Sequence, residues 1–259
     1  MTKSFFPFLL FLALAVSALG AQEKKAAAPP AKSQTAAPAK KIDFASVKAP
    51  KPAADLKPGT WKYKTTVAMG TRDVEVSIVT EVKEDGNFWT ANTTMEGFLG
   101  EIIDTTTLEK GTLVLRKLDH KQGRLSYHLD FTDSKASGSL DVDGQDRPLS
   151  GVLTGPVFAN GAGTAQIIAC LPLAEGYSAY YRNFDVREQR ERLMQLKVAG
   201  VEKVTVPAGV FAAYRVEITS ADGGNVKESV WIAKDSRQPV KLSAVLAAMG
   251  SVMTQELEK

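Results

Sequence analysis

Cysteine and histidine are almost missing from this chain, which has one Cys and two His in 259 residues. A single Cys excludes an internal disulfide framework. Cys170 stands in the apolar stretch AQIIACLPL, a setting that favours a buried, inert thiol. A reactive thiol is the alternative, but no base stands beside it in the sequence.

The two histidines, His120 and His128, flank a Gln-Gly turn on adjacent predicted strands, so the two rings could approach one another. Asp119 and Asp130 would complete a metal site. Four basic residues in the same hairpin oppose cation binding: Arg116, Lys117, Lys121 and Arg124. We therefore interpret both histidines as surface residues on a polar strand face.

Catalytic signatures are absent as well. The sequence has no G-x-S-x-G elbow, no H-E-x-x-H and no phosphate-binding glycine loop. The segment DVDGQD alternates Asp141, Asp143 and Asp146 as a calcium loop does, but its glycine, Gly144, comes too early and no bidentate Glu follows. We predict a polar turn there, and expect no catalytic residue, no cofactor and no metal site.

Long apolar runs are missing except at the N-terminus. Lys3, the apolar run 5–16 and the small residues 17–21 together have the form of a signal peptide. We assign it to residues 1–21 and expect export to the periplasm or cell envelope. A retained N-terminal anchor is the alternative. No Cys follows the apolar run, so a lipobox is excluded.

Residues 22–58 contain few large apolar side chains and are mostly Ala, Pro and Lys. Such a composition predicts a disordered linker. Residues 21–59 carry eight Lys against three acids, and Lys3 adds one more positive charge, so residues 60–259 are near −3 although the whole chain is +3. The folded part therefore gives no indication of nucleic-acid binding. The lysines suit a solvated tether, with contact to an anionic membrane or cell wall as the alternative.

From residue 60 onward, apolar and polar residues alternate between glycine turns, which predicts about a dozen strands. One segment, Thr164 to Ala169, has helical spacing instead. We therefore predict a single all-β, mainly antiparallel domain over 60–259, built as a curled meander sheet or open half-barrel with one short helix. The strands expected after residue 100 cover 102–108, 113–118, 125–131, 137–142, 187–198, 201–206, 211–220, 227–233, 239–245 and 251–257.

The charged run 185–193, DVREQRERL, holds balanced acids and arginines. It reads as a charged edge strand or a short solvated helix.

The most patterned segment is VEKVTVPAGVFAAYRVEI, residues 201–218. Pro207 presets φ for a turn, and Gly209 tolerates the positive φ that a turn or bulge requires. Phe211 is expected to cover the end of the core. We interpret these three residues as a structural hairpin corner, with no chemistry of their own.

Two segments carry a resemblance to a known family: AQIIACLPLAEGYSAYY, and VAGVEKVTVPAGVFAAYRVEI followed by ESVWIAKDSRQPVKLSAV. Together they resemble bacterial exported proteins of the domain of unknown function family 3108, over about residues 165–257. The family often has Thr where Val210 stands. The resemblance implies a curved antiparallel sheet similar in outline to the periplasmic lipoprotein carriers.

By that analogy, we expect a non-enzymatic envelope protein that binds a hydrophobic ligand, such as a lipid or a lipoprotein acyl chain, on its curved sheet. The ligand-binding residues are unknown from the sequence. The alternative is a structural or scaffolding protein that contacts an envelope protein partner. A hydrolase of envelope polymers is less favoured.

Overall fold

The structure is a computed structural model that describes residues 42–259 except 71, 98–99 and 247–249. The expected signal peptide, 1–21, and the first part of the expected linker, 22–41, lie outside the described residues. Within the described part, no helix is long and apolar enough to cross a membrane.

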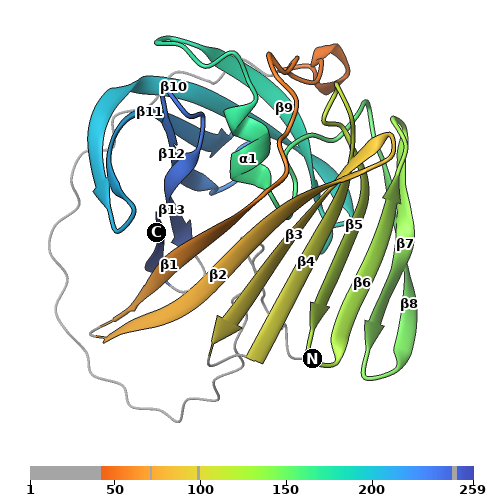
Figure 1. Ribbon diagram of the computed structural model, residues 1–259. Coiled ribbons are helices and arrows are strands. Elements are labelled where there is room, and N and C mark those ends of the chain that lie inside the picture. Colours follow the sequence, from red (N-terminus) through yellow and green to blue (C-terminus); the bar gives the residue numbers. More distant parts are fainter. Residues whose placement is uncertain (1–41, 71, 98–99, 247–249) are drawn as a thin grey trace, which may run out of the picture.

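Fourteen strands form one antiparallel sheet in the order β8-β7-β6-β5-β4-β3-β2-β1-β14-β13-β12-β11-β10-β9. Two meanders thus meet where β1 pairs with β14, with Tyr63 opposite Leu257. The sheet curls on itself without closing (Figure 1). The predicted all-β antiparallel class is confirmed. The strands are β1 (Gly59–Met69), β2 (Arg72–Asp85), β3 (Phe88–Gly97), β4 (Gly100–Glu109), β5 (Leu115–Gln122), β6 (Leu125–Phe131), β7 (Lys135–Val142), β8 (Gln145–Val152), β9 (Ser178–Asp185), β10 (Arg190–Val206), β11 (Gly209–Ser220), β12 (Lys227–Ala233), β13 (Pro239–Leu246) and β14 (Ser251–Leu257).

Period-two alternation places apolar side chains on the inner face of the curl, which we define as the face that packs toward the helix α1 (Thr164–Ala169). In β2, for example, Val76, Ile78 and Val82 are buried while Glu75 and Lys83 are exposed. A sharp turn after Asp85 joins β2 to β3. Alternation therefore predicts both the strands and their faces.

The predicted strands differ from the structure in two ways: two strands were missed, and two predicted strands are one. Residues 145–152 and 178–185 form β8 and β9, which we did not predict as strands. Both are sheet edges, and β8 is largely exposed and contains Pro148, so its apolar alternation is weak. The segments 187–198 and 201–206 are one strand, β10, interrupted only by a bulge between Val198 and Gly200.

The charged run 185–193 also differs from both expectations. Residues 186–189 form the turn between β9 and β10, and β10 itself lies inside the sheet between β9 and β11. Arg192 is held by Asp222, with its Nε 2.6 Å from the Asp222 carboxylate. The charges therefore stabilise a turn and a neighbouring loop.

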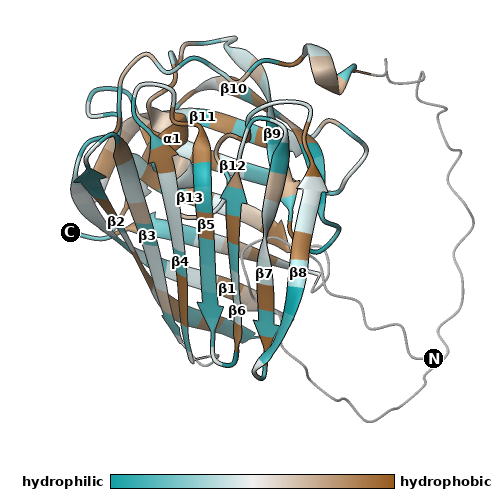
Figure 2. Cartoon of the chain, turned by 90° about the vertical axis from the view of Figure 1, so that its right-hand side faces the viewer, coloured by the Kyte–Doolittle hydropathy of each residue, from teal (hydrophilic) through white to brown (hydrophobic). Residues whose placement is uncertain are grey.

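The helix α1 occupies the predicted residues and lies within the curl (Figure 1). It begins after Gly163, whose φ of 71° is left-handed. Its residues Gln166 to Ala169 are buried, and the helix carries mainly hydrophobic colours in Figure 2. With the preceding loop, which buries Val157 and Phe158, it fills this end of the inner face.

The end of the expected linker, residues 42–58, packs against the domain. It includes the short 3-10 helix η1 (Phe44–Ser46). Leu56 is buried, and Asp55 accepts hydrogen bonds from Trp89 Nε1 at 2.7 Å and Gly111 N at 3.1 Å. Backbone and carboxylate hydrogen bonds hold residues 42–58 against the domain. Because such bonds do not depend on apolar side chains, the composition of this stretch did not indicate that it is ordered.

Candidate functional site

The hairpin β5–β6 sends its two histidines to opposite faces of the sheet. His120 lies opposite Tyr127, and His128 lies opposite Asp119. The His120 side chain is 0% exposed and the His128 side chain 43% exposed. The two rings therefore do not meet, and the interpretation of both as surface histidines is wrong for His120.

His120 belongs to a polar row on the inner face. Its Nδ1 lies 2.7 Å from the Asp104 carboxylate on β4, and its ring stacks on Tyr127 with 4.9 Å between centroids. Thr80 and Thr93 continue the row across β2 and β3, their hydroxyls 3.1 Å apart. This row of polar residues crosses an otherwise apolar face of the sheet. Buried hydrogen bonds of this kind can fix the register of the strands, so the row has a structural explanation as well as a possible chemical one.

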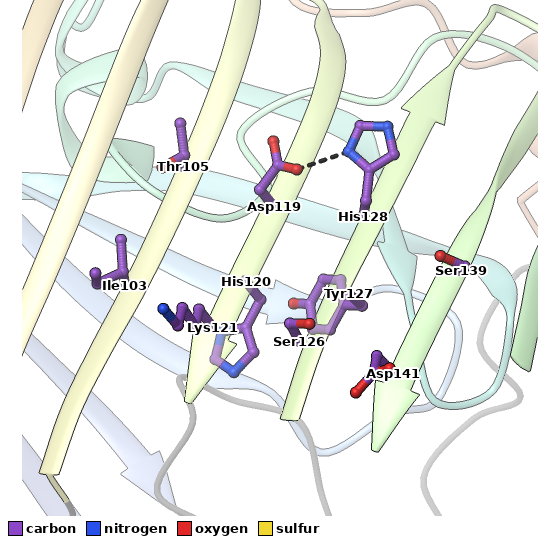
Figure 3. Close-up of a pocket in the computed structure, with 10 residues that line it drawn as sticks. All are labelled: Ile103, Thr105, Asp119, His120, Lys121, Ser126, Tyr127, His128, Ser139 and Asp141. Atoms are coloured by element: carbon purple, nitrogen blue, oxygen red, sulfur yellow. Dashed lines mark hydrogen bonds and ion pairs between the residues drawn. The ribbon is translucent and has the colours of Figure 1, made fainter. Parts of the chain in front are cut away.

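His128 lines a shallow groove of about 240 Å³ on the outer face of β4–β7. Its Nδ1 is 2.6 Å from Asp119 and its Nε2 is 3.0 Å from Asp130. Figure 3 shows the His128 and Asp119 side chains turned toward each other across β5 and β6. The hydrogen bond to Asp119 is the main cause that raises the His128 pKa.

In the described part of the chain, no group of three or more His, Cys, Asp or Glu residues is arranged to hold a metal ion. The segment 141–146 is the tight turn between β7 and β8, with Asp141 opposite Asp146 and Gly144 N donating to the Asp141 side chain at 3.0 Å. The polar-turn prediction for this segment is confirmed.

The Pro-Ala-Gly segment forms the turn at the tip of the long β10–β11 hairpin, with Val206 opposite Gly209. Gly209 has a φ of 142°, and Ala208 N donates to Leu257 O at 2.9 Å. Phe211 packs against the inner cluster that contains Tyr63 and Val204. The structure thus places Pro207, Gly209 and Phe211 at a corner that folds over the end of β14.

Cys170 follows α1 and is buried. Desolvation is the main cause that raises its pKa to about 11. A thiol held in its neutral form is a poor nucleophile, in agreement with the inert thiol that the sequence indicated.

Glu228 is the inner-face residue that sequence reasoning missed. In β12 it lies opposite Ile218 of β11 and Ala244 of β13, both buried, and paired residues of antiparallel strands share a face. The signal was available: in KESVWI, Glu228 alternates in phase with Val230 and Ile232. A carboxylate at a position where the alternation places apolar side chains could have indicated an inward-facing acid.

The Glu228 carboxylate has no hydrogen-bond or ion-pair partner among the described residues, and desolvation raises its pKa to about 7. Glu228 nevertheless keeps an intermediate exposed fraction. The Glu228 side chain is therefore only partly covered by protein on the inner face. Several apolar inner-face residues are likewise only partly buried against the core, among them Leu125, Leu140, Ala179 and Leu242.

Fold and site together define an all-β protein with one curled antiparallel sheet and an apolar, partly accessible inner face. A family model described as "Protein of unknown function (DUF3108)" matches residues 56–258, so the chain belongs to this family. The match spans both meanders, whereas the sequence motifs carried the resemblance only over about 165–257.

No curated protein matches the chain. A solved structure from Bacteroides fragilis, described as an exported protein with a YmcC-like fold, is 11% identical with a TM-score of 0.34. The alignment covers 80% of this chain and 99% of that one. At this level the likeness carries no argument about the fold or the function of the chain.

Proposed function

We propose that this protein is an exported, non-catalytic protein of the periplasm or cell envelope that binds a hydrophobic ligand, such as a lipid or acyl chain, on the inner face of its sheet. The observation that carries the proposal is the set of inner-face apolar side chains that remain partly exposed, Leu125, Leu140, Ala179 and Leu242. A fully packed interior would cover such residues.

The proposed site lies on the part of the inner face that α1 and the loop before it leave uncovered. The helix α1 and the loop before it occupy one end of the curl, where Phe158, Ile167 and Ile168 are fully buried. The partly exposed residues lie on β6, β7, β9 and β13. Apolar walls with a few polar groups are the usual lining of small-molecule sites.

The non-catalytic part of the proposal is supported by the burial of an inner-face acid–base pair, His120 and Asp104. His120 and Asp104 have the distance of a catalytic dyad, 2.7 Å, but the His120 side chain is 0% exposed. A general base must reach the proton that it removes. A hydrolase of envelope polymers is therefore less well supported.

A second candidate function is scaffolding through an envelope protein partner. The outer groove around His128 and Asp119 supports it, as does Val152, which is 82% exposed on the edge strand β8. Edge strands offer unpaired backbone groups to a partner. Crosslinking in cells tests this function, and recovery of no neighbouring protein would count against it.

We further propose that the Lys-rich segment before residue 42 acts as a tether and also contacts anionic membrane or cell-wall polymer. Clustered lysines favour anionic surfaces and lose that attraction in salt. Sedimentation with anionic lipid vesicles, compared with neutral vesicles, tests this contact. Equal sedimentation with both would exclude it.

Binding of a fluorescent fatty alcohol to the full chain tests the main proposal. Leu242→Gln, on the inner face of β13, is expected to weaken binding about tenfold because it replaces apolar surface with an amide. Ser243→Gln, one residue along and on the outer face, is the matched control and is expected to bind normally. Equal binding of the probe by both variants, or no binding by the wild type, would contradict the proposal.

A further inference from the structure

The unpaired inner-face carboxylate points to the class of ligand. Burying an acid without a partner is costly, and proteins normally pair such groups. Glu228 is flanked by Ile218 on β11 and Ala244 on β13, so neither neighbouring strand offers it a charge. A stabilising sheet residue would be apolar here, as Val230 and Ile232 are.

One further polar group lies nearby. Tyr181 on β9 is 2% exposed, and its hydroxyl has no hydrogen-bond partner among the described residues. Burial is the main cause that raises the Tyr181 pKa, and the charge of Glu228 adds to the rise. A carboxylate and a hydroxyl, both unpartnered, thus share one part of an apolar wall.

We propose that Glu228, with Tyr181 beside it, recognises a protonated amine in the head group of an amphiphile whose chain lies on the inner face. This inference rests on the proposed function, since it assumes that an apolar chain binds there. An ammonium group supplies both the charge that the carboxylate lacks and hydrogen-bond donors for it and for the tyrosine oxygen. A fatty acid would place a second carboxylate beside Glu228 and be repelled.

The apolar surroundings strengthen this discrimination. A charge pair interacts more strongly where water is partly excluded, and Ala179 and Leu242 provide the adjoining apolar surface. The preference for the amine is expected to grow as the pH rises through the Glu228 pKa of about 7, because the carboxylate then carries its charge.

Titration calorimetry of the full chain at pH 8 with decylamine, decanol and decanoate, each below its micelle concentration, tests the inference. We expect decylamine to bind at least about tenfold tighter than decanol, and decanoate to bind more weakly than decanol. Glu228→Gln, which is isosteric, is expected to remove the preference and keep decanol binding. Tyr181→Phe is expected to reduce it by a smaller factor.

Glu217→Gln is the matched control, because Glu217 is an exposed acid on the neighbouring strand that already pairs with Arg215 at 3.1 Å; it should keep the preference. Binding of decanol and decylamine with equal affinity would overturn the role of Glu228 and leave the hydrophobic site standing. Failure of all three probes to bind would overturn the hydrophobic site itself and this inference with it.

Discussion

A carboxylate that a protein buries without a partner makes the fold depend on pH. The Glu228 pKa rises from 4.5 to about 7 on folding, so the folded state holds this proton more tightly than the unfolded state does. Between these two values, stability falls as the pH rises, and above about 7 the loss is complete.

Glu228→Gln is therefore expected to raise stability at pH 8 by up to about 3 kcal/mol, or several degrees in Tm, and to change little at pH 4. Thermal melts of the wild type and the variant across this pH range measure the effect. An equal gain at pH 4 and pH 8 would show that the carboxyl titrates normally.

The His128 ring adds to the pH dependence in the same direction. Its pKa is raised chiefly by the hydrogen bond to Asp119, so the stability that it contributes is present below its unfolded pKa and is lost as the pH rises through the folded value. We expect Asp119→Asn to lower the His128 pKa toward its ordinary value, as followed by NMR titration. Asp141→Asn, in the same groove without a bond to His128, is the control and should leave the pKa in place.

At the scale of elements, the β10–β11 hairpin depends on its corner. Gly209 has a φ of 142°, a conformation that β-branched residues avoid. Gly209→Val is expected to cost about 2 kcal/mol or more, whereas Ala208→Ser is expected to be nearly silent. Chemical denaturation measures both, and equal small effects would contradict the assigned role of the turn.

The elements also show what the sequence could predict. The helix over Thr164–Ala169 and the strands β11 to β14 came close to their observed bounds because alternation and glycine turns are local signals. The strands β8 and β9 were missed, since edge strands alternate weakly and their position at the rim is decided by distant pairing. The register of β5 and β6 places His120 on the inner face and His128 on the outer face. The prediction that both residues lie in strands did not determine these faces.

Within the site, the sequence indicated the hairpin residues and an apolar inner face, and the structure added Glu228. Its phase with Val230 and Ile232 was visible, but a single charged residue in a strand is normally assigned to the outer face. Only the pairing with Ile218 and Ala244 shows that it faces inward.

At the scale of the whole molecule, side chains tie the two edges of the open sheet together. Thr154, just after β8, donates through both its N and its hydroxyl to Glu191 of β10, each at 2.9 Å. Arg182 of β9 donates to the Thr154 hydroxyl at 3.0 Å and lies 3.6 Å from Glu191. It also donates to Phe44 O, so one buried arginine joins both edges and the N-terminal segment.

Glu191→Gln is expected to destabilise the fold by about 3 kcal/mol, since it leaves the Arg182 guanidinium, which is 1% exposed, without its counter-charge. Faster hydrogen exchange at the Thr154 amide would locate the damage at the edges. Glu217→Gln removes an exposed ion pair instead and should cost less than about 1 kcal/mol. Equal costs would mean that the edges are held by other contacts.

The central claim is that the inner face holds an apolar ligand, and native mass spectrometry of the full chain purified from its host tests it most directly. We predict a bound species with the mass of an amphiphile, released by organic solvent and reduced in Leu242→Gln. A mass equal to the polypeptide alone, with no uptake of a fluorescent fatty alcohol afterwards, would contradict the account.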